Sequence, residues 1–261
     1  MKKLLSLMAY ALMMSSILVS CGGDDDKKED EPEETTAPAP ASPSYEYTGS
    51  AGFLAAINTV TVTPGMDLGN GFVTPETTIG FVTASAGFWD TPGATLKDAG
   101  AVTFAGQSLT KADNNAYYYS GGEQGFTGTG GIAETDAKAW TVASPAISYT
   151  NTKDYPKVTA FSSMSKTVTK GSDLTLDWGG NTGAPDSIYV GVISYEGPSV
   201  FKTVAGSVSS ATFTAAELEV LTGSQAMIQV TPYNWNKQNI SGKDYYFINQ
   251  TTYTDINGEI K

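Results

Sequence analysis

Short apolar runs separated by turn residues fill the chain from residue 47 to residue 261, and this pattern limits the folds that it can adopt. Within a run the apolar side chains recur at every second position, as at Ile188, Val190 and Val192. A period of two puts alternate side chains on opposite faces of a β-strand. Because Gly, Ser, Thr and Asn clusters separate the runs, we predict an all-β protein built from β-sandwiches.

We divide this region into two β-sandwich domains, a β-rich domain over residues 47–152 and a second over residues 153–261. The second half resembles fibronectin type III and related immunoglobulin-like modules, because Trp178 ends a strand where those modules carry a core tryptophan, and Gly242 precedes the final strand. An alternating apolar run surrounds Trp178, so we expect it to be buried. Residues 214–217 match a capping box and predict one helical turn between sheets.

Residues 1–20 have the pattern of a secretory signal peptide. Lys2 and Lys3 give a positive start, and the apolar run at residues 4–19 is too short to span a membrane comfortably. The run ends in Leu18-Val19-Ser20-Cys21, which resembles the lipobox of bacterial lipoproteins. That resemblance implies cleavage before Cys21 and acylation of this residue, the single cysteine of the chain. The membrane would then be a partner through the lipid chains, such as palmitate, on Cys21.

Residues 21–46 follow as an acidic, proline-containing tether. This segment cannot bury enough apolar surface to offset the entropy lost on ordering, so we predict a disordered linker. An acidic run after the lipidated cysteine is similar to the signal that exports some Gram-negative lipoproteins to the outer face of the outer membrane. Gly22, where Asp is usual for inner-membrane retention, favours the same location. The alternative is a solvated spacer that faces the periplasm.

Several residue types are missing, and their absence excludes many kinds of chemistry. The chain has no histidine, and all 15 of its basic residues are lysine. A Ser-His-Asp or Cys-His nucleophile and the usual zinc or haem ligands are therefore excluded, and we expect no cofactor and no metal site. The formal net charge of −12 also disfavours nucleic acid as a partner.

Asn-rich and Asp-rich turns are the remaining sites that could hold a cation. Asp67 with Asn70, and residues 113–115, could supply oxygen atoms to calcium, although neither group has EF-hand spacing. Side-chain hydrogen bonds that shape turns are the simpler use of these residues, and we favour it.

One cluster of aromatic and amide side chains is typical of ligand binding. We predict that residues 232–239 form a loop tip at the end of a strand. The candidate ligand-binding residues there are Tyr233, Asn234, Trp235 and Asn236, with Trp89 as a separate, weaker candidate. Aromatic rings stack on sugar C–H groups, and amides bind sugar hydroxyls. The alternative is that Trp235 covers the end of the apolar core.

Three classes of function remain. The first is a non-catalytic lipoprotein of the cell envelope that binds a glycan or a protein or serves as a structural component. The second is a glycoside-active enzyme, since a pair of carboxylates is the one hydrolytic apparatus that needs neither His nor Arg. The third is a purely mechanical spacer.

Substitution of Cys21, the predicted acyl acceptor, tests the predicted lipid anchor. We expect Cys21→Ser to abolish lipid labelling and to leave the precursor uncleaved, because the thiol accepts the diacylglycerol. Metabolic labelling with a fatty acid, followed by electrophoresis, measures both effects. Normal labelling of the variant would contradict the lipoprotein hypothesis.

Overall fold

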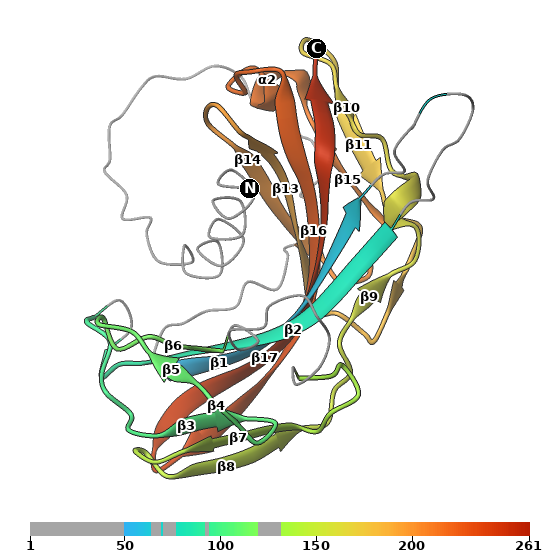
Figure 1. The fold of residues 1–261 in the computed structure, drawn as a ribbon. Helices are drawn as coiled ribbons and strands as arrows, with labels where there is room; N and C mark the ends of the chain where they lie inside the picture. Colours follow the sequence, from blue (N-terminus) through green and yellow to red (C-terminus); the bar gives the residue numbers. More distant parts are fainter. Residues whose placement is uncertain (1–49, 64–68, 70–76, 92–93, 120–131) are drawn as a thin grey trace, which may run out of the picture. The chain divides into compact units, whose positions relative to one another are not determined.

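The computed structural model describes residues 50–63, 69, 77–91, 94–119 and 132–261. The predicted signal peptide, Cys21, the tether, and Asp67 with Asn70 lie outside these residues. All described residues belong to one compact unit, Pro40–Lys261. Their regular secondary structure is almost entirely β-strand, with one short α-helix and one 3-10 turn, which confirms the all-β prediction (Figure 1). In this described part, no helix has the length and apolar character needed to cross a membrane.

The chain forms strands of very unequal length. The strands are β1 (Ser50–Thr63), β2 (Thr77–Phe88), β3 (Val102–Phe104), β4 (Gln107–Ser108), β5 (Thr110–Lys111), β6 (Tyr117–Tyr119), β7 (Lys138–Val142), β8 (Ile147–Asn151), β9 (Lys157–Val158), β10 (Thr167–Val168), β11 (Leu174–Asp177), β12 (Asn181–Thr182), β13 (Ser187–Ser194), β14 (Val200–Ala205), β15 (Ser210–Phe213), β16 (Gln225–Ile240) and β17 (Lys243–Ile260). The helices are η1 (Phe161–Ser163) and α2 (Ala215–Leu218).

The long strands form one main sheet, with the order β14-β13-β16-β17-β1-β2-β6-β5 and with β10 paired to β17. Strands β1 and β10 run parallel to β17, and the other neighbours in this sheet are antiparallel. The pairing of β1 with β17 extends from Ser50 opposite Asp244 to Val62 opposite Asp255. The first and last of the long strands are therefore neighbours inside the sheet.

Two apolar cores lie on the same face of the main sheet. In β1, Leu54 and Ala56 belong to one core, and Val62 belongs to the other. In β17, Phe247 belongs to the same core as Leu54, and Tyr253 to the same core as Val62. We call these the first core and the second core. Alternate residues of a strand point to the same face, so a single strand serves both cores in turn.

Each core is closed by its own second layer. Strands β4, β3, β7 and β8 form a four-stranded sheet, whose residues Phe104 and Trp140 lie in the first core. The β11-β15 pair contributes Leu176 and Phe213 to the second core. In Figure 1 the four-stranded sheet lies beside one end of β1 and β17, and β11 and β15 lie beside the other end of β17.

Two local predictions are confirmed in the second core. Trp178 is completely buried, and its Nε1 donates to Asn181 Oδ1 at 3.0 Å. The helical turn α2 begins with a capping box, in which the Thr214 side chain accepts from the Glu217 amide and the Glu217 carboxylate accepts from the Thr214 amide. These reciprocal bonds satisfy two amides that the first turn would leave without partners.

The prediction of a loop tip at residues 232–239 is wrong. All of these residues lie in β16, which continues to Ile240 and pairs with β17 through registers such as Trp235 opposite Ile248. The run of amides and aromatics is therefore a strand whose side chains alternate between two faces of the main sheet.

The predicted boundary at residue 152 is crossed by both the main sheet and the first core. Strand β1 pairs with β17 along nearly its whole length, and Tyr245 and Phe247 of β17 pack in the first core. The two-domain division predicts that the second half folds alone, whereas the shared sheet and the shared first core predict that it does not.

The fragment 157–261 tests that division. We expect it not to fold, because the removal of β1 leaves one edge of β17 unpaired and exposes Phe247, which is completely buried in the whole chain. Circular dichroism of the fragment, compared with a chain that starts at residue 50, measures the difference. A cooperative thermal transition of the isolated fragment would instead support two domains.

Candidate functional site

The main sheet has a second face, opposite the two cores, which we call the free face. It consists of Phe201 and Thr203 on β14, Tyr189 and Gly191 on β13, Gln229, Thr231, Tyr233 and Trp235 on β16, Ile248, Gln250, Thr252 and Thr254 on β17, Ala55, Ile57, Thr59 and Thr61 on β1, and Ile79, Phe81, Thr83 and Ser85 on β2. The same face continues toward the end of β16 and the start of β17 with Tyr246 and with Lys237 and Asp244, which pair at 3.2 Å. The polar residues in its middle, Gln229, Thr231, Thr252 and Thr254, are only 5–8% exposed. The small apolar cluster on this side contains residues of β1, β16 and β17 alone.

The aromatic residues of the free face are mostly half-buried against their neighbours. Trp235 meets the ring of Tyr246 edge-on, with ring centroids 5.5 Å apart. Tyr189 and Phe201 are stacked, with centroids 5.2 Å apart and planes inclined by 16°. Burial raises the pKa of Tyr189 to about 12. On β2, the ring of Phe81 is exposed at 36%, and its apolar neighbour Ile79 is exposed at 41%.

The middle of the free face carries hydroxyl and amide groups that bind one another. Gln229 Nε2 donates to Thr231 Oγ1 at 3.0 Å, and Gln250 Nε2 donates to Thr252 Oγ1 at 3.2 Å. The Thr231 hydroxyl donates to Thr252 Oγ1 at 3.4 Å. These contacts fix the side chains as an ordered array across β16 and β17.

The five candidate residues from the sequence do not form one site. Trp235 and Tyr233 lie on the free face, whereas Asn234 and Asn236 lie on the core face, because successive residues of a strand point in opposite directions. Trp89 is buried, packs against Phe53 at 5.9 Å, and donates its Nε1 to Ser50 O at 2.7 Å.

Asn234 belongs to a polar seam between the two cores, formed by Asn58, Asn151, Asn234, Asn249 and Thr251. Each of these residues is at most 5% exposed. Asn249 Nδ2 donates to the carbonyl of Lys153 at 2.8 Å, and Asn234 Nδ2 donates to the carbonyl of Asp154 at 2.9 Å. The seam therefore fastens the segment after β8 to the middle of the main sheet.

The seam is closed to ligands. Among the described residues, no donor reaches Oδ1 of Asn234 or of Asn249, and both atoms are fully buried. A ligand outside the protein cannot contact atoms with no accessible surface, so we regard the seam as a structural element. Sequence reasoning missed it because an isolated asparagine in a strand gives no signal of its partners.

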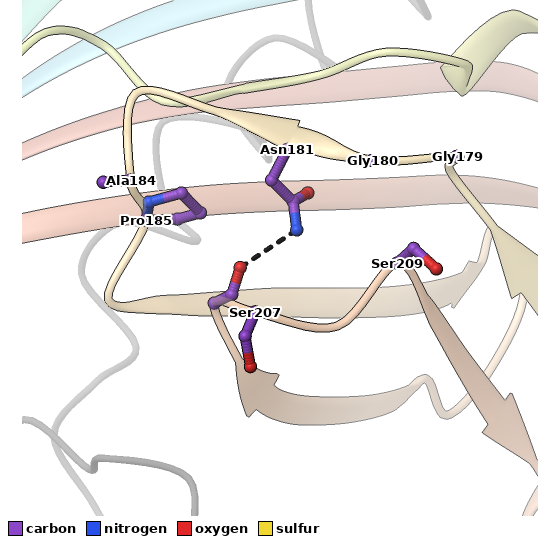
Figure 2. Close-up of a pocket in the computed structure, with 8 residues that line it drawn as sticks. Gly179, Gly180, Asn181, Ala184, Pro185, Ser207 and Ser209 are labelled. Carbon is purple, nitrogen blue, oxygen red and sulfur yellow. Dashed lines mark hydrogen bonds between the residues drawn. The ribbon is translucent and has the colours of Figure 1, made fainter.

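A hollow of about 460 Å³ lies beside Trp178 and is lined by Asn181, Pro185, Ser207 and Ser209 together with glycines (Figure 2). Asn181 Nδ2 donates to Gly206 O at 2.9 Å and to Val208 O at 2.7 Å. Asn181 Oδ1 also accepts from Trp178 Nε1. The oxygen and the NH₂ group of the Asn181 side chain are therefore both bonded to the surrounding turns, and Asn181 has a structural role in this hollow.

A second hollow, of about 340 Å³, contains two carboxylates and two lysines. Glu134 pairs with Lys157 and accepts from Asn58 Nδ2 at 3.2 Å, while Asp154 faces Lys138 at 4.0 Å. Each carboxylate therefore lies within 4.0 Å of a lysine ammonium group.

The described turn at residues 113–115 has the hydrogen bonding of a local turn. The Ala116 amide donates to Asn114 Oδ1 at 3.1 Å, and Asn115 has a left-handed φ of 62°. Within the described residues, no group of three or more His, Cys, Asp or Glu side chains could hold a metal ion.

Comparison with protein-family models and with curated proteins finds no match to this chain. Any functional assignment therefore rests on the sequence and on the geometry described above.

Removal of one asparagine side chain from the polar seam tests the structural role of the seam. We expect Asn249→Ala to lower the free energy of unfolding by about 1–3 kcal/mol, because the part-buried Lys153 carbonyl loses its donor and the fully buried amide is removed. Asn239→Ala is the matched control, since the exposed amide of Asn239 donates to Asp244 on the same hairpin, and it should change stability by less than about 0.5 kcal/mol. Equal urea midpoints for the two variants would contradict a structural role for the seam.

Proposed function

We propose that the protein is a lipid-anchored component of the cell envelope that binds a glycan or a protein without catalysis. In this proposal Cys21 carries the lipid anchor, and the folded part faces the cell exterior from the outer membrane. The signal peptide, the lipobox resemblance and the acidic tether support the location. The exposed apolar side chains of Ile79 and Phe81 support the binding role.

The exposure of Ile79 and Phe81 is the observation that carries the binding part of the proposal. Both are large apolar side chains of β2 on the free face, with exposed fractions of 41% and 36%. Exposed apolar side chains that lie together are typical of a region that contacts another molecule. The hydroxyl and amide groups in the middle of the free face are buried and do not contribute to this surface.

Hydrolysis is the weaker hypothesis for this chain. Without histidine, a glycoside-active enzyme would need an acid and a second carboxylate free to act on the substrate. In the hollow that contains Glu134 and Asp154, both carboxylates face lysines. A non-catalytic role is therefore the better-supported proposal.

A glycan array probed with the soluble protein tests the binding role. We expect the protein without residues 1–21 to bind neutral glycans, and Phe81→Ser to weaken that binding about tenfold or more, because a free-face ring is lost. Val220→Ser is the matched control, since Val220 is also exposed, at 48%, but follows α2. Equal binding by both variants would contradict the involvement of the free face.

A protein ligand is the second candidate, and the exposed apolar side chains of Ile79 and Phe81 favour it. The same two variants distinguish the ligands when purified envelope proteins replace the glycan array. Failure of both kinds of ligand to bind would contradict the proposed function as a whole.

A further inference from the structure

Asp255 has the most buried carboxylate among the ion pairs of the described residues. Its side chain is 2% exposed, whereas the carboxylate side chains of the other pairs are 29–89% exposed. Asp255 lies in β17 between Val62 of β1 and Ile228 of β16, which both belong to the second core. Burial of a charged carboxylate is costly unless its partners compensate for the lost water, so the partners of Asp255 are informative.

Lys166 lies against one oxygen of this carboxylate. Its Nζ is 2.5 Å from Asp255 Oδ2, yet no hydrogen bond from the described residues reaches Oδ2, which is fully buried. The nitrogen is therefore close to the carboxyl group without the alignment of a hydrogen bond. The backbone fixes this position, because the Lys166 carbonyl accepts from the Glu259 amide at 2.8 Å and β10, which begins at the next residue, pairs with β17.

The other oxygen of Asp255 has two donors. Oδ1 accepts from the backbone amide of Asn257 at 2.9 Å and from Asn257 Nδ2 at 3.1 Å. Two N–H groups on one oxygen stabilise the negative charge that develops there when a nucleophile attacks the carboxyl carbon. The two oxygens therefore differ, since Oδ1 is held by donors and Oδ2 faces the lysine nitrogen.

We infer that Lys166 and Asp255 condense after folding to form an amide bond between their side chains. A proton first passes from the ammonium group to Oδ2, and the neutral Nζ then attacks Cγ while charge develops on Oδ1. The Cγ–Oδ2 bond breaks, and Oδ2 leaves as water with the transferred proton and a second proton from Nζ. One ammonium group and one carboxylate thus give one amide and one water molecule, with no oxidant, reductant or cofactor.

The amide accounts for a buried pair that an ion pair explains poorly. It replaces two charges at the edge of the second core with one neutral group, which costs less free energy to bury. It also joins the residue before β10 to β17 and so restricts the unfolded chain, as a disulfide does. The inference goes beyond the proposed function, because it concerns two side chains of the fold and needs no ligand.

The pair of Lys202 and Glu217 is a matched control within the same chain. Its Nζ and Oε2 are 2.8 Å apart, but the Glu217 side chain is 42% exposed. Lys202 Nζ also donates to the Thr212 carbonyl at 2.7 Å, and the Glu217 carboxylate accepts from the Thr214 amide. Since water reaches this carboxylate and hydrogen bonds occupy both groups, we expect no amide there.

Mass spectrometry of a tryptic digest of the full chain tests the inference. Trypsin cleaves after lysine, and an amide on Lys166 blocks that cleavage. We expect residues 158–170 joined to residues 244–261, with the summed mass of the two peptides less one water molecule. Recovery of residues 158–166 and residues 244–261 only as separate peptides, after prolonged incubation of the folded protein at neutral pH, would overturn the inference.

Lys166→Arg separates the amide from a simple ion pair. Arginine keeps the positive charge but stays protonated, so its guanidinium group is not a nucleophile. We expect the joined peptides to be absent from this variant and its melting temperature to fall by at least about 5 °C. Lys202→Arg is the control, which should keep the joined peptides and melt within about 2 °C of the parent. Joined peptides from Lys202 and Glu217 of the parent, in equal yield, would overturn the inference, because an exposed pair would then react as well as the buried one.

Asn257→Ala tests the geometry in a chain that keeps both reacting side chains. Asn257 is exposed, so we expect the variant to fold, and the loss of one donor to Oδ1 should slow appearance of the joined peptides about tenfold or more. A time course of digests, started from freshly refolded protein, measures this rate. An unchanged rate would contradict the role assigned to Asn257.

Discussion

The parallel pairing of β1 with β17 is the interaction on which the rest of the structure depends. It joins the first and last long strands of the chain along twelve registered positions, from Ser50 to Val62. Because β17 also pairs with β16, and β1 with β2, this one pairing connects the β14-β13-β16 side of the main sheet to the β2-β6-β5 side. Without it the main sheet would divide into two sheets, each of which lines part of both cores. Parallel pairs over such a sequence distance are costly to form, so the buried cores must offset the loss of chain entropy.

The continuous sheet has a different chemistry on each face. On the core face, apolar residues fill both ends and the asparagines of the polar seam lie between them, where they hold the connection near Lys153 and Asp154. On the free face the same strands present threonines, glutamines and aromatic rings. Since successive residues alternate between faces, Asn234 fastens the fold while Trp235 and Tyr233 contribute to the proposed binding surface.

The sequence predicts the local features well and the long-range ones poorly. Period-two runs such as Ile188, Val190 and Val192 identify strands, and the buried Trp178 and the α2 capping box follow from patterns within a few residues. The loop predicted at residues 232–239 fails because Pro232 and four amides are typical of turns. In the sheet, however, β17 pairs with this segment from Tyr233 opposite Gln250 to Asn239 opposite Asp244 and keeps it extended. No local pattern shows that β1 lies beside β17, so neither the seam nor the free face is visible before the strands are paired.

The most direct test of the role of the β1–β17 pairing is whether the two cores unfold together. The chain has four tryptophans, and Trp140 lies in the first core while Trp178 lies in the second. In one variant only Trp140 is retained, and in another only Trp178, with phenylalanine at the other three positions. In each variant, urea unfolding followed by fluorescence and by circular dichroism should give one coincident transition, because β1 and β17 pass through both cores. A fluorescence midpoint that differs from the circular dichroism midpoint in either variant would show that the cores unfold separately, and would contradict the central role of the β1–β17 pairing.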